Sequence, residues 1–276
     1  MLIRDSGTVV DLRGKALKDN ILIEGPVKDV VIKNGTVKGE IRFRARDYRQ
    51  VVEEHNKTKH WTREVRKVAP QGAVLRDLTI EPSGKTHALY CGPGTTGVKV
   101  VDCDFSGESR GPLVYLSMEG AYHTVLRCEF RGRTGARREV IAIDGCAESV
   151  IKDCRFLRCT QGGVYIYRNS GENGTIRHQE PRFNLIKDNR FDLSGMWLRS
   201  SLLDSEVPYG VIIGSRQGDR TRHNDLDAGY PWGSSKNNRD FARQNTVIGN
   251  RFKGDWFKRW VHDNDRNNTV VNNKAW

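Results

Sequence analysis

The sequence predicts an all-β fold, a single right-handed parallel β-helix solenoid over residues 1–276 with three strands per coil and about 8–10 coils. A short phrase that returns along the chain carries this prediction. It runs apolar, variable, apolar, then two small or polar residues, one variable residue and a final apolar residue. Its turn residues Cys103, Cys128 and Cys154 lie 25 and 26 residues apart, and a period of this length in strand-like units is typical of a solenoid.

Each coil is expected to begin with a first strand of β-branched or aromatic residues. The candidate first strands are residues 21–23, 41–43, 87–90, 113–116, 140–143, 164–167, 211–213 and 257–261. A connection then leads to the repeated phrase, which supplies a second strand, a tight turn and a very short third strand. The turn residues stand at positions 35, 78, 103, 128, 154, 189, 250 and 273. A β-sandwich, the alternative, has strands every ~8–12 residues but does not predict one turn phrase at this period.

Three long insertions interrupt the period, at residues 44–72, 168–182 and 214–243. Each follows a first strand, so all three are expected to project from one edge of the solenoid. Long loops in a compact fold are usually functional, which favours a working surface beside the first strands and under the two later loops. The first insertion is more basic than acidic. It forms either a solvated capping segment, with a helical turn or two at residues 48–56, or a ligand clamp.

The formal charge of +12 on 276 residues favours a polyanionic partner, which could be an acidic polysaccharide, an anionic surface or nucleic acid. Nucleic acid is the weakest of these, because basic residues alternate with acidic ones instead of forming a stripe. No apolar run is long enough to predict membrane insertion. No signal segment follows Met1, so an extracellular protein, which is favoured, would leave the cell by another route, such as on a phage particle. A cytoplasmic protein is the alternative.

The six cysteines are expected to be reduced. Cys103, Cys128 and Cys154 share one position in successive coils, so they should stack as a ladder at about 4.8 Å, each as a small buried apolar residue. No Cys or His spacing predicts a zinc site. Calcium is the one cofactor that the sequence suggests, although the candidate aspartates do not have the spacing of an EF-hand. Its oxygen ligands would be Asp219, Asp225 and Asp227, for which ion pairing with nearby arginines is the alternative.

The segment richest in chemical groups begins with the first strand at 164–167. Alternation along this strand points Tyr165 and Tyr167 outward, where exposed rings beside arginines suit sugar rings and carboxylates. The candidate catalytic residues are Arg168, His178, Arg177, Glu172, Asp144 and Tyr167. The candidate substrate-binding residues are Tyr115, Tyr165, Asn169, Arg216, Asp219, Arg220, His223, Tyr230, Trp232 and Lys236. A loop stabilised by its own Arg–Glu pairs is the alternative to a functional segment.

The turn ladder and the coil period resemble the pectate-lyase-like superfamily of right-handed β-helices, from about Ile21 to Asn273. This superfamily includes polysaccharide lyases, uronate epimerases, glycoside hydrolases and phage tailspikes. The resemblance implies a substrate that lies along the outer face of a parallel sheet, flanked by long loops. For a lyase it implies an Arg or Lys base, and often calcium or another cation to neutralise the uronate carboxylate. No lyase motif assigns these roles to residues of this sequence, so the resemblance predicts fold and not reaction.

The leading functional hypothesis is a polysaccharide lyase that acts on an acidic polysaccharide by β-elimination. In this hypothesis His178 or His223 is the base and Tyr167 protonates the leaving oxygen. The uronate carboxylate would be neutralised by Arg168, Arg177, Arg216 and Arg220. Variants are a uronate epimerase and a glycoside hydrolase that pairs Asp144 with Glu172 or Asp219. The alternative is a non-catalytic glycan-binding or structural β-helix of a phage or surface assembly, to which a homo-oligomer such as a trimer would be suited.

Overall fold

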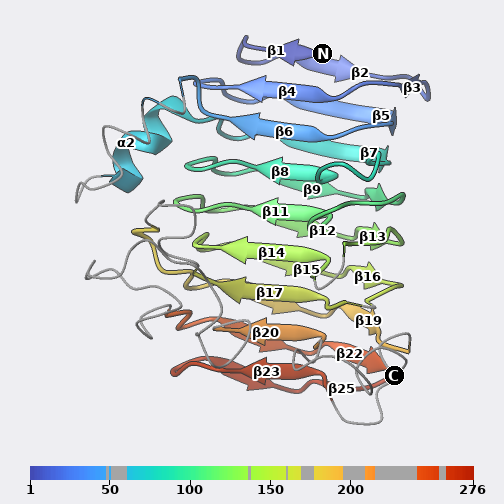
Figure 1. Ribbon diagram of the computed structural model, residues 1–276, viewed down its shortest axis with the longest axis vertical. Coiled ribbons are helices and arrows are strands. Elements are labelled where there is room, and N and C mark those ends of the chain that lie inside the picture. The colour runs from blue at the N-terminus through green and yellow to red at the C-terminus, as the bar shows by residue number, and fades with distance from the viewer. Residues whose placement is uncertain are drawn as a thin grey trace.

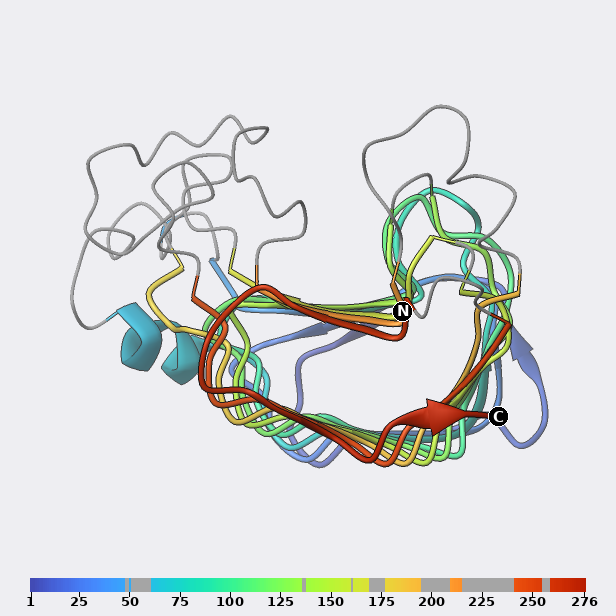
Figure 2. The same ribbon diagram turned by 90° about the horizontal axis from the view of Figure 1, so that it is seen from below.

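The coils of a parallel β-helix follow one another along the whole chain (Figure 1). The computed structural model describes residues 1–47, 50, 61–135, 138–159, 161–168, 177–194, 209–214, 241–254 and 259–276. Strands that occupy the same place in successive coils pair in parallel, and Figure 2 shows the coils superposed along the axis. The predicted right-handed solenoid with three strands per coil is confirmed, and its first strands form a sheet of nine.

The first strands of all coils form one parallel sheet, here called the first sheet. Its strands are β1 (Leu2–Ile3), β4 (Ile21–Glu24), β6 (Ile41–Arg44), β8 (Leu89–Cys91), β11 (Val114–Leu116), β14 (Ile141–Asp144), β17 (Val164–Tyr167), β20 (Val211–Ile213) and β23 (Val261–Asp263). Side chains alternate between its two faces, so that aliphatic residues such as Ile41, Leu89 and Val114 fill the interior. The residues between them face outward.

The second and third strands share a sheet of sixteen strands. The second strands are β2 (Val9–Asp11), β5 (Val31–Val37), β7 (Val74–Ile80), β9 (Lys99–Val101), β12 (Thr124–Leu126), β15 (Val150–Lys152), β18 (Leu185–Lys187), β21 (Thr246–Ile248) and β24 (Thr269–Val271). The third strands are β3 (Ala16–Leu17), β10 (Asp104–Phe105), β13 (Glu129–Phe130), β16 (Arg155–Phe156), β19 (Arg190–Asp192), β22 (Arg251–Lys253) and β25 (Lys274–Ala275). The long strands β5 and β7 run through the turn and serve as second and third strand at once.

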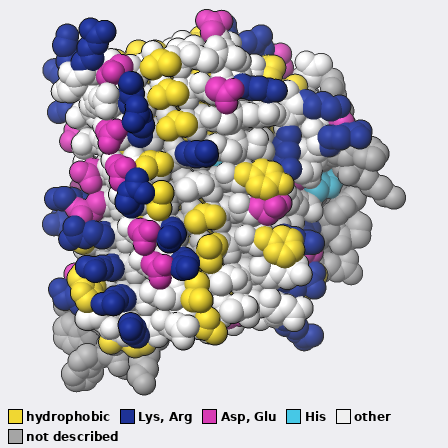
Figure 3. Space-filling view, turned by 180° about the vertical axis from the view of Figure 1, so that it is seen from behind, with side chains coloured by type: hydrophobic (Ala, Val, Ile, Leu, Met, Phe, Trp, Pro, Cys, Tyr) yellow, Lys and Arg dark blue, Asp and Glu magenta, His cyan; other side chains and the backbone are white. Residues whose placement is uncertain are grey.

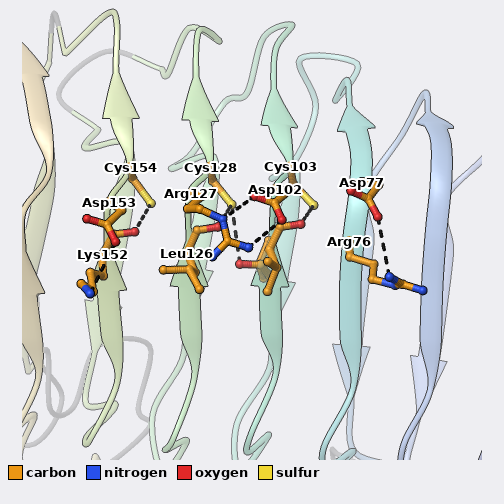
Figure 4. A network of polar contacts seen from close by, with 12 residues as sticks. Arg76, Asp77, Asp102, Cys103, Leu126, Arg127, Cys128, Lys152, Asp153 and Cys154 are labelled. Atoms are coloured by element: carbon orange, nitrogen blue, oxygen red, sulfur yellow. Dashed lines mark hydrogen bonds and ion pairs between the residues drawn. The ribbon is translucent and has the colours of Figure 1, made fainter.

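A tight turn joins each second strand to its third strand, and its geometry explains the repeated phrase. The residue before the turn residue has φ between 50° and 60° at Asn34, Asp77, Asp102, Arg127, Asp153 and Asp188. Asn and Asp tolerate this left-handed conformation better than other residues with a side chain. The buried thiols of Cys103, Cys128 and Cys154 follow and donate to carbonyl oxygens two residues earlier at 3.2–3.4 Å (Figure 4). The predicted position of this cysteine ladder is confirmed.

Asparagine replaces cysteine at the turn in the later coils. The side-chain oxygen of Asn250 accepts the backbone N–H of Asn189 at 3.0 Å, and Nδ2 of Asn189 donates to the carbonyl oxygen of Ile151 at 2.9 Å. Asn273 repeats this arrangement beneath Asn250. An amide group both accepts and donates, so the stacked asparagines satisfy buried backbone groups of neighbouring coils.

A stack of phenylalanines fills the interior beside the third strands. The rings are those of Phe105, Phe130, Phe156, Phe191 and Phe252. Neighbouring ring centres are 4.4–5.0 Å apart, with near-parallel planes. One Phe per coil therefore holds the register of the solenoid through aromatic packing as well as backbone pairing.

Two parts of the sequence prediction need correction. The last first strand was predicted at 257–261, of which residues 257 and 258 lie outside the described residues. Strand β23 begins at Val261, which pairs with Val211, and the ring of Trp260 stacks on Phe252 with centres 5.8 Å apart. The three predicted insertions do each follow a first strand, at β6, β17 and β20. The sequence missed a fourth long connection, which follows a third strand, because β19 ends at Asp192 and β20 begins at Val211.

One helix of the described residues lies against the solenoid, α2 (Trp61–Val68). Its Val65 is fully buried against the coils. Gly94 permits this close approach, since a Cβ there would lie 2.9 Å from Val65 Cγ1. The helical turn predicted at 48–56 falls outside the described residues, apart from Gln50. Within the described ranges, no helix has the length and apolar character needed to span a membrane.

Candidate functional site

A column of outward-facing side chains crosses the first sheet at strands β6, β8 and β11. Arg42, Tyr90 and Tyr115 occupy one register position on these neighbouring strands. The guanidinium carbon of Arg42 lies 4.5 Å from the centre of the Tyr90 ring, and the Tyr90 and Tyr115 rings stack with centres 5.5 Å apart. The sheet thus presents one cation and two aromatic rings at successive coils along the solenoid axis.

His87 lies beside this column, with its ring centre 5.5 Å from that of Tyr90 and 5.4 Å from that of Tyr115. Its Nδ1 is 2.7 Å from the carbonyl oxygen of Pro112. A carbonyl oxygen only accepts, so Nδ1 carries the proton and Nε2 keeps its lone pair. Burial lowers the pKa of His87, and the Pro112 contact opposes this only in part. The imidazole is therefore neutral near neutral pH, with Nε2 available as a base or hydrogen-bond acceptor.

An open cavity of about 590 Å³ lies over the column, and we call it the aromatic groove. Its cationic lining residues are Arg42, Lys85, Arg110, Arg138 and Arg177. No acidic side chain of the described residues lines it. Residues 81–88 and 106–113 each connect a third strand to the next first strand, and in Figure 2 such connections rise above the first sheet and form one wall. The groove is therefore aromatic at its base and cationic around it.

Asp144 lies behind the groove, fully buried at the end of β14. The Tyr115 hydroxyl donates to its Oδ2 at 2.5 Å, and Nη2 of Arg177 donates to the same oxygen at 2.9 Å. Burial raises the pKa of Tyr115 well above its usual value, and the neighbouring Asp144 raises it further. Tyr115 thus remains protonated and fixed in orientation, while the charge of Arg177 is paired with a carboxylate at the edge of the groove.

Tyr165 and Tyr167 lie on the outer face of β17 as predicted, but they are only 4% and 1% exposed. The prediction of exposed rings is wrong because the neighbouring strands supply Ala142 and Ile212, which pack with Tyr165 in one apolar cluster. The Tyr167 hydroxyl donates to Oε1 of Glu139 at 2.9 Å. Of the two tyrosines, Tyr167 lines the groove. It pairs with Asp144 in the strand register, so the predicted closeness of Asp144 and Tyr167 is confirmed.

Arg168 is buried outside the groove, next to Glu180. Its Nη1 lies 3.8 Å from Oε1 of Glu180. The Glu180 carboxylate also pairs with Arg182 through Oε2 at 2.6 Å and with Arg243 through Oε1 at 3.1 Å. Three arginines thus surround one carboxylate, an arrangement that joins the segment after β17 to the next coil. Arg168 is not among the residues that line the groove.

Glu119 joins α2 to the segment that includes His178. Its carboxylate accepts the Thr62 hydroxyl of the helix and the backbone N–H groups of His178 and Gln179, the latter two at 2.7 and 3.1 Å. Burial raises the pKa of the Glu119 carboxyl. His178 is thus held by its backbone, and its side chain is half-buried and does not line the groove.

The remaining candidate residues fall outside the described residues. They are Glu172, Asn169, Arg216, Asp219, Arg220, His223, Tyr230, Trp232 and Lys236, together with Asp225 and Asp227 of the suggested calcium site. In the part of the chain that the structure does describe, no group of three or more His, Cys, Asp or Glu side chains is placed to hold a metal ion.

Sequence reasoning missed most of the aromatic groove. The residues not foreseen are Arg42, Lys85, His87, Tyr90, Arg110 and Arg138. The signal was present, because aligning the first strands residue by residue puts Arg42, Tyr90 and Tyr115 at one outward position. The two later insertions instead predicted a working surface at the later coils.

No protein-family model matches the chain, and no curated protein matches it. Among solved structures, the chain is similar to the Streptococcus pneumoniae surface protein and adhesin PfbA. The match has 12% sequence identity and a TM-score of 0.42, and it covers 99% of this chain and 88% of that chain.

Proposed function

We propose that this β-helix binds an acidic polysaccharide in the aromatic groove. The observation that carries the proposal is the column of Arg42, Tyr90 and Tyr115 beneath a cavity that five cations line. Such a site fits a polymer with apolar ring faces and spaced negative charges. The proposal favours a glycan-binding protein of a cell surface or phage particle over the lyase of the leading sequence hypothesis.

Two interactions make an acidic glycan the best fit. The rings of Tyr90 and Tyr115 stack on each other and Arg42 lies over the other side of Tyr90, so the groove offers mainly ring edges, against which the C–H groups of a sugar ring can pack. A uronate carboxylate or a sulfate accepts two parallel hydrogen bonds from a guanidinium group. Arg42 donates Nε and Nη2 to Glu40 and Arg138 pairs with Glu139, so Arg110 is the groove arginine best suited to this contact. The parallel strands place these groups along the axis, so an extended chain of sugars would contact them in sequence.

The test is calorimetric titration with oligosaccharides of alginate, pectate, hyaluronan and heparin. Tyr90→Ala should weaken binding by about tenfold, equivalent to ~1.4 kcal/mol, because it removes apolar surface at the base of the groove and the ring on which Arg42 packs. Tyr90→Phe keeps the ring and should bind as the natural protein does. Arg42→Gln should weaken binding, whereas Arg63→Gln removes an exposed cation of α2 and should not. Binding that is unaffected by Tyr90→Ala and by Arg42→Gln would rule out the groove as the site.

A second candidate function is β-elimination in the same groove, favoured by the neutral His87 beside Tyr115. In this reaction Nε2 of His87 takes the C5 proton of a uronate, the C4–O bond breaks and a C4–C5 double bond forms. Arginines of the groove would neutralise the carboxylate, and a hydroxyl group or water would protonate the leaving oxygen. The same mixtures, followed by ultraviolet absorbance, report the unsaturated product. A rise that His87→Gln abolishes while binding persists supports a lyase; no rise on any polymer excludes elimination of those polymers and leaves binding intact.

A further inference from the structure

A row of outward-facing side chains follows the third strands, and its charge changes sign along the solenoid. The residues in register are Asp104, Glu129, Arg155, Arg190, Arg251 and Lys274. In the earlier part of the row Glu129 is neutralised by Arg131 and by Arg155, the latter at 2.9 Å. The later part has only cations. We call Arg190, Arg251 and Lys274 the cationic row.

The cationic row carries exposed charge that its surroundings do not neutralise. All three side chains are exposed, and none forms an ion pair with another of the described residues. They stand on neighbouring parallel strands, about 4.8 Å apart. Like charges directly opposite on neighbouring strands destabilise a sheet, so this arrangement lowers the stability of the protein unless an anion lies across it.

A shallow cavity accompanies the row. Its volume is about 370 Å³, and its lining residues are Asp188, Arg190, Gly249, Arg251, Asn272 and Lys274. Gly249 takes the positive φ position that carries a side chain in other coils, and the Asp188 carboxylate lies where a Cβ of that residue would stand. Asp188 and Asn272 add hydrogen-bond acceptors beside the cations.

An exposed aromatic ring borders the same surface. Trp276 lies on the outer side of the third strands, 46% exposed. The guanidinium carbon of Arg190 is 5.5 Å from its ring centre, and Nζ of Lys253 is 5.9 Å from it. An indole held between two cations repeats, on another face of the molecule, the combination of ring and positive charge found in the aromatic groove.

We propose that the cationic row is a second binding surface for a linear acidic glycan, which lies along the solenoid axis. In Figure 3 lysine and arginine side chains gather along the left edge, the edge of the third strands, whereas the aromatic groove lies on the first sheet. Sugar hydroxyls would donate to Asp188 and Asn272, while spaced carboxylates or sulfates pair with the row. Nucleic acid is the other polyanion that such a row could take, and the test below separates it from a glycan.

The test compares two triple variants for retention on immobilised heparin and alginate, with neutral dextran as the blank. The first is Arg190→Gln/Arg251→Gln/Lys274→Gln. The control is Lys38→Gln/Arg76→Gln/Arg133→Gln, which removes three exposed cations that have acidic neighbours. Both variants lose the same net charge. Both are made with Tyr90→Ala and Arg42→Gln already present, so the result does not depend on the aromatic groove.

The row variant should bind about tenfold more weakly than the control, with a shallower dependence on salt. Its melting temperature should match or exceed that of the Tyr90→Ala/Arg42→Gln parent, since repulsion within the row is removed at the cost of one exposed contact between Arg190 and Trp276. Equal binding by the two triple variants would overturn the proposal. Displacement of the glycan by single-stranded DNA at lower concentration than by free heparin would overturn the choice of a glycan. Loss of binding in the row variant alone would establish this surface even if the groove binds nothing.

Discussion

His123 occupies a position that later coils fill with residues that do not titrate. Its side chain is 1% exposed, and its Nδ1 accepts the backbone N–H of Val98 at 3.2 Å. The backbone N–H of His123 in turn donates to Ser149 Oγ. Ser149 and Asn184 then take the same role in the next two coils. Burial lowers the pKa of His123 from 6.5 to about 4, because a charged imidazole would lose its hydration there.

This shift predicts a specific loss of stability in acid. A histidine whose pKa is lowered by folding contributes stability that is present above its unfolded pKa and is lost as the pH falls through its folded pKa. Between pH 6.5 and about 4 the loss should reach on the order of 3 kcal/mol. The measurement is urea unfolding at several pH values. His123→Asn, which copies Asn184, should remove this part of the pH dependence, and Ser149→Asn should leave it; identical slopes in both variants would contradict the assignment.

The helix α2 depends on one buried carboxylate for its attachment. Glu119 accepts Thr62 from the helix and two backbone N–H groups from the segment after β17. Arg66 strengthens the contact by donating to the Glu119 carbonyl oxygen at 2.7 Å and to Gln179 Oε1 at 2.6 Å. The same segment carries Arg177 to the edge of the aromatic groove, so the attachment of the helix and the shape of the groove are linked.

We therefore expect Glu119→Ala to release α2. The substitution leaves two backbone N–H groups without their acceptor, and amide hydrogen exchange within Trp61–Val68 should accelerate by about tenfold or more. Glu119→Gln keeps an oxygen that can accept these groups and should change exchange far less. Equal protection in the Ala variant and the natural protein would show that apolar packing of Val65 suffices.

Elements governed by local rules could be predicted from the sequence. The turn needs a residue that accepts positive φ, followed by a small buried polar or thiol group, and that requirement repeats as a readable phrase. Elements whose position depends on other coils could not be predicted. The burial of Tyr165 comes from Ala142 and Ile212 on neighbouring strands, and β23 begins where Val261 pairs with Val211 of β20. The sequence distance between such partners varies with each insertion.

The variable sequence distance between neighbouring coils also explains why neither candidate binding surface could be predicted from the sequence. Arg190, Arg251 and Lys274 are separated by an insertion and by a whole coil, so a search along the chain finds basic residues that alternate with acidic ones. Arg42 and Tyr90 lie on either side of the first insertion. The prediction that basic residues form no stripe holds along the sequence but not across the folded surface.

Two surfaces on one rigid solenoid should make the whole molecule bivalent. Binding at the aromatic groove and at the cationic row would let one protein hold two polymer chains, or two parts of one chain, and raise the apparent affinity. Mixing with a long acidic polymer should then produce assemblies that light scattering detects. Tyr90→Ala/Arg42→Gln, or Arg190→Gln/Arg251→Gln/Lys274→Gln with the aromatic groove left intact, should still bind but should scatter no more than the polymer itself. Strong scattering by both single-surface variants would contradict the bivalent arrangement.

The parallel pairing of strands also sets a fixed spacing between side chains along the solenoid axis. Groups on one outward row repeat at the strand spacing, about 4.8 Å, which the backbone hydrogen bonds fix and which loop sequences cannot alter. A polymer whose charges repeat in step with this spacing, or with a simple multiple of it, stays in phase over several coils. A polymer with another repeat drifts out of phase after a few units. Selectivity among acidic polymers would then arise from commensurate length, and adding coils would sharpen it without any new kind of contact.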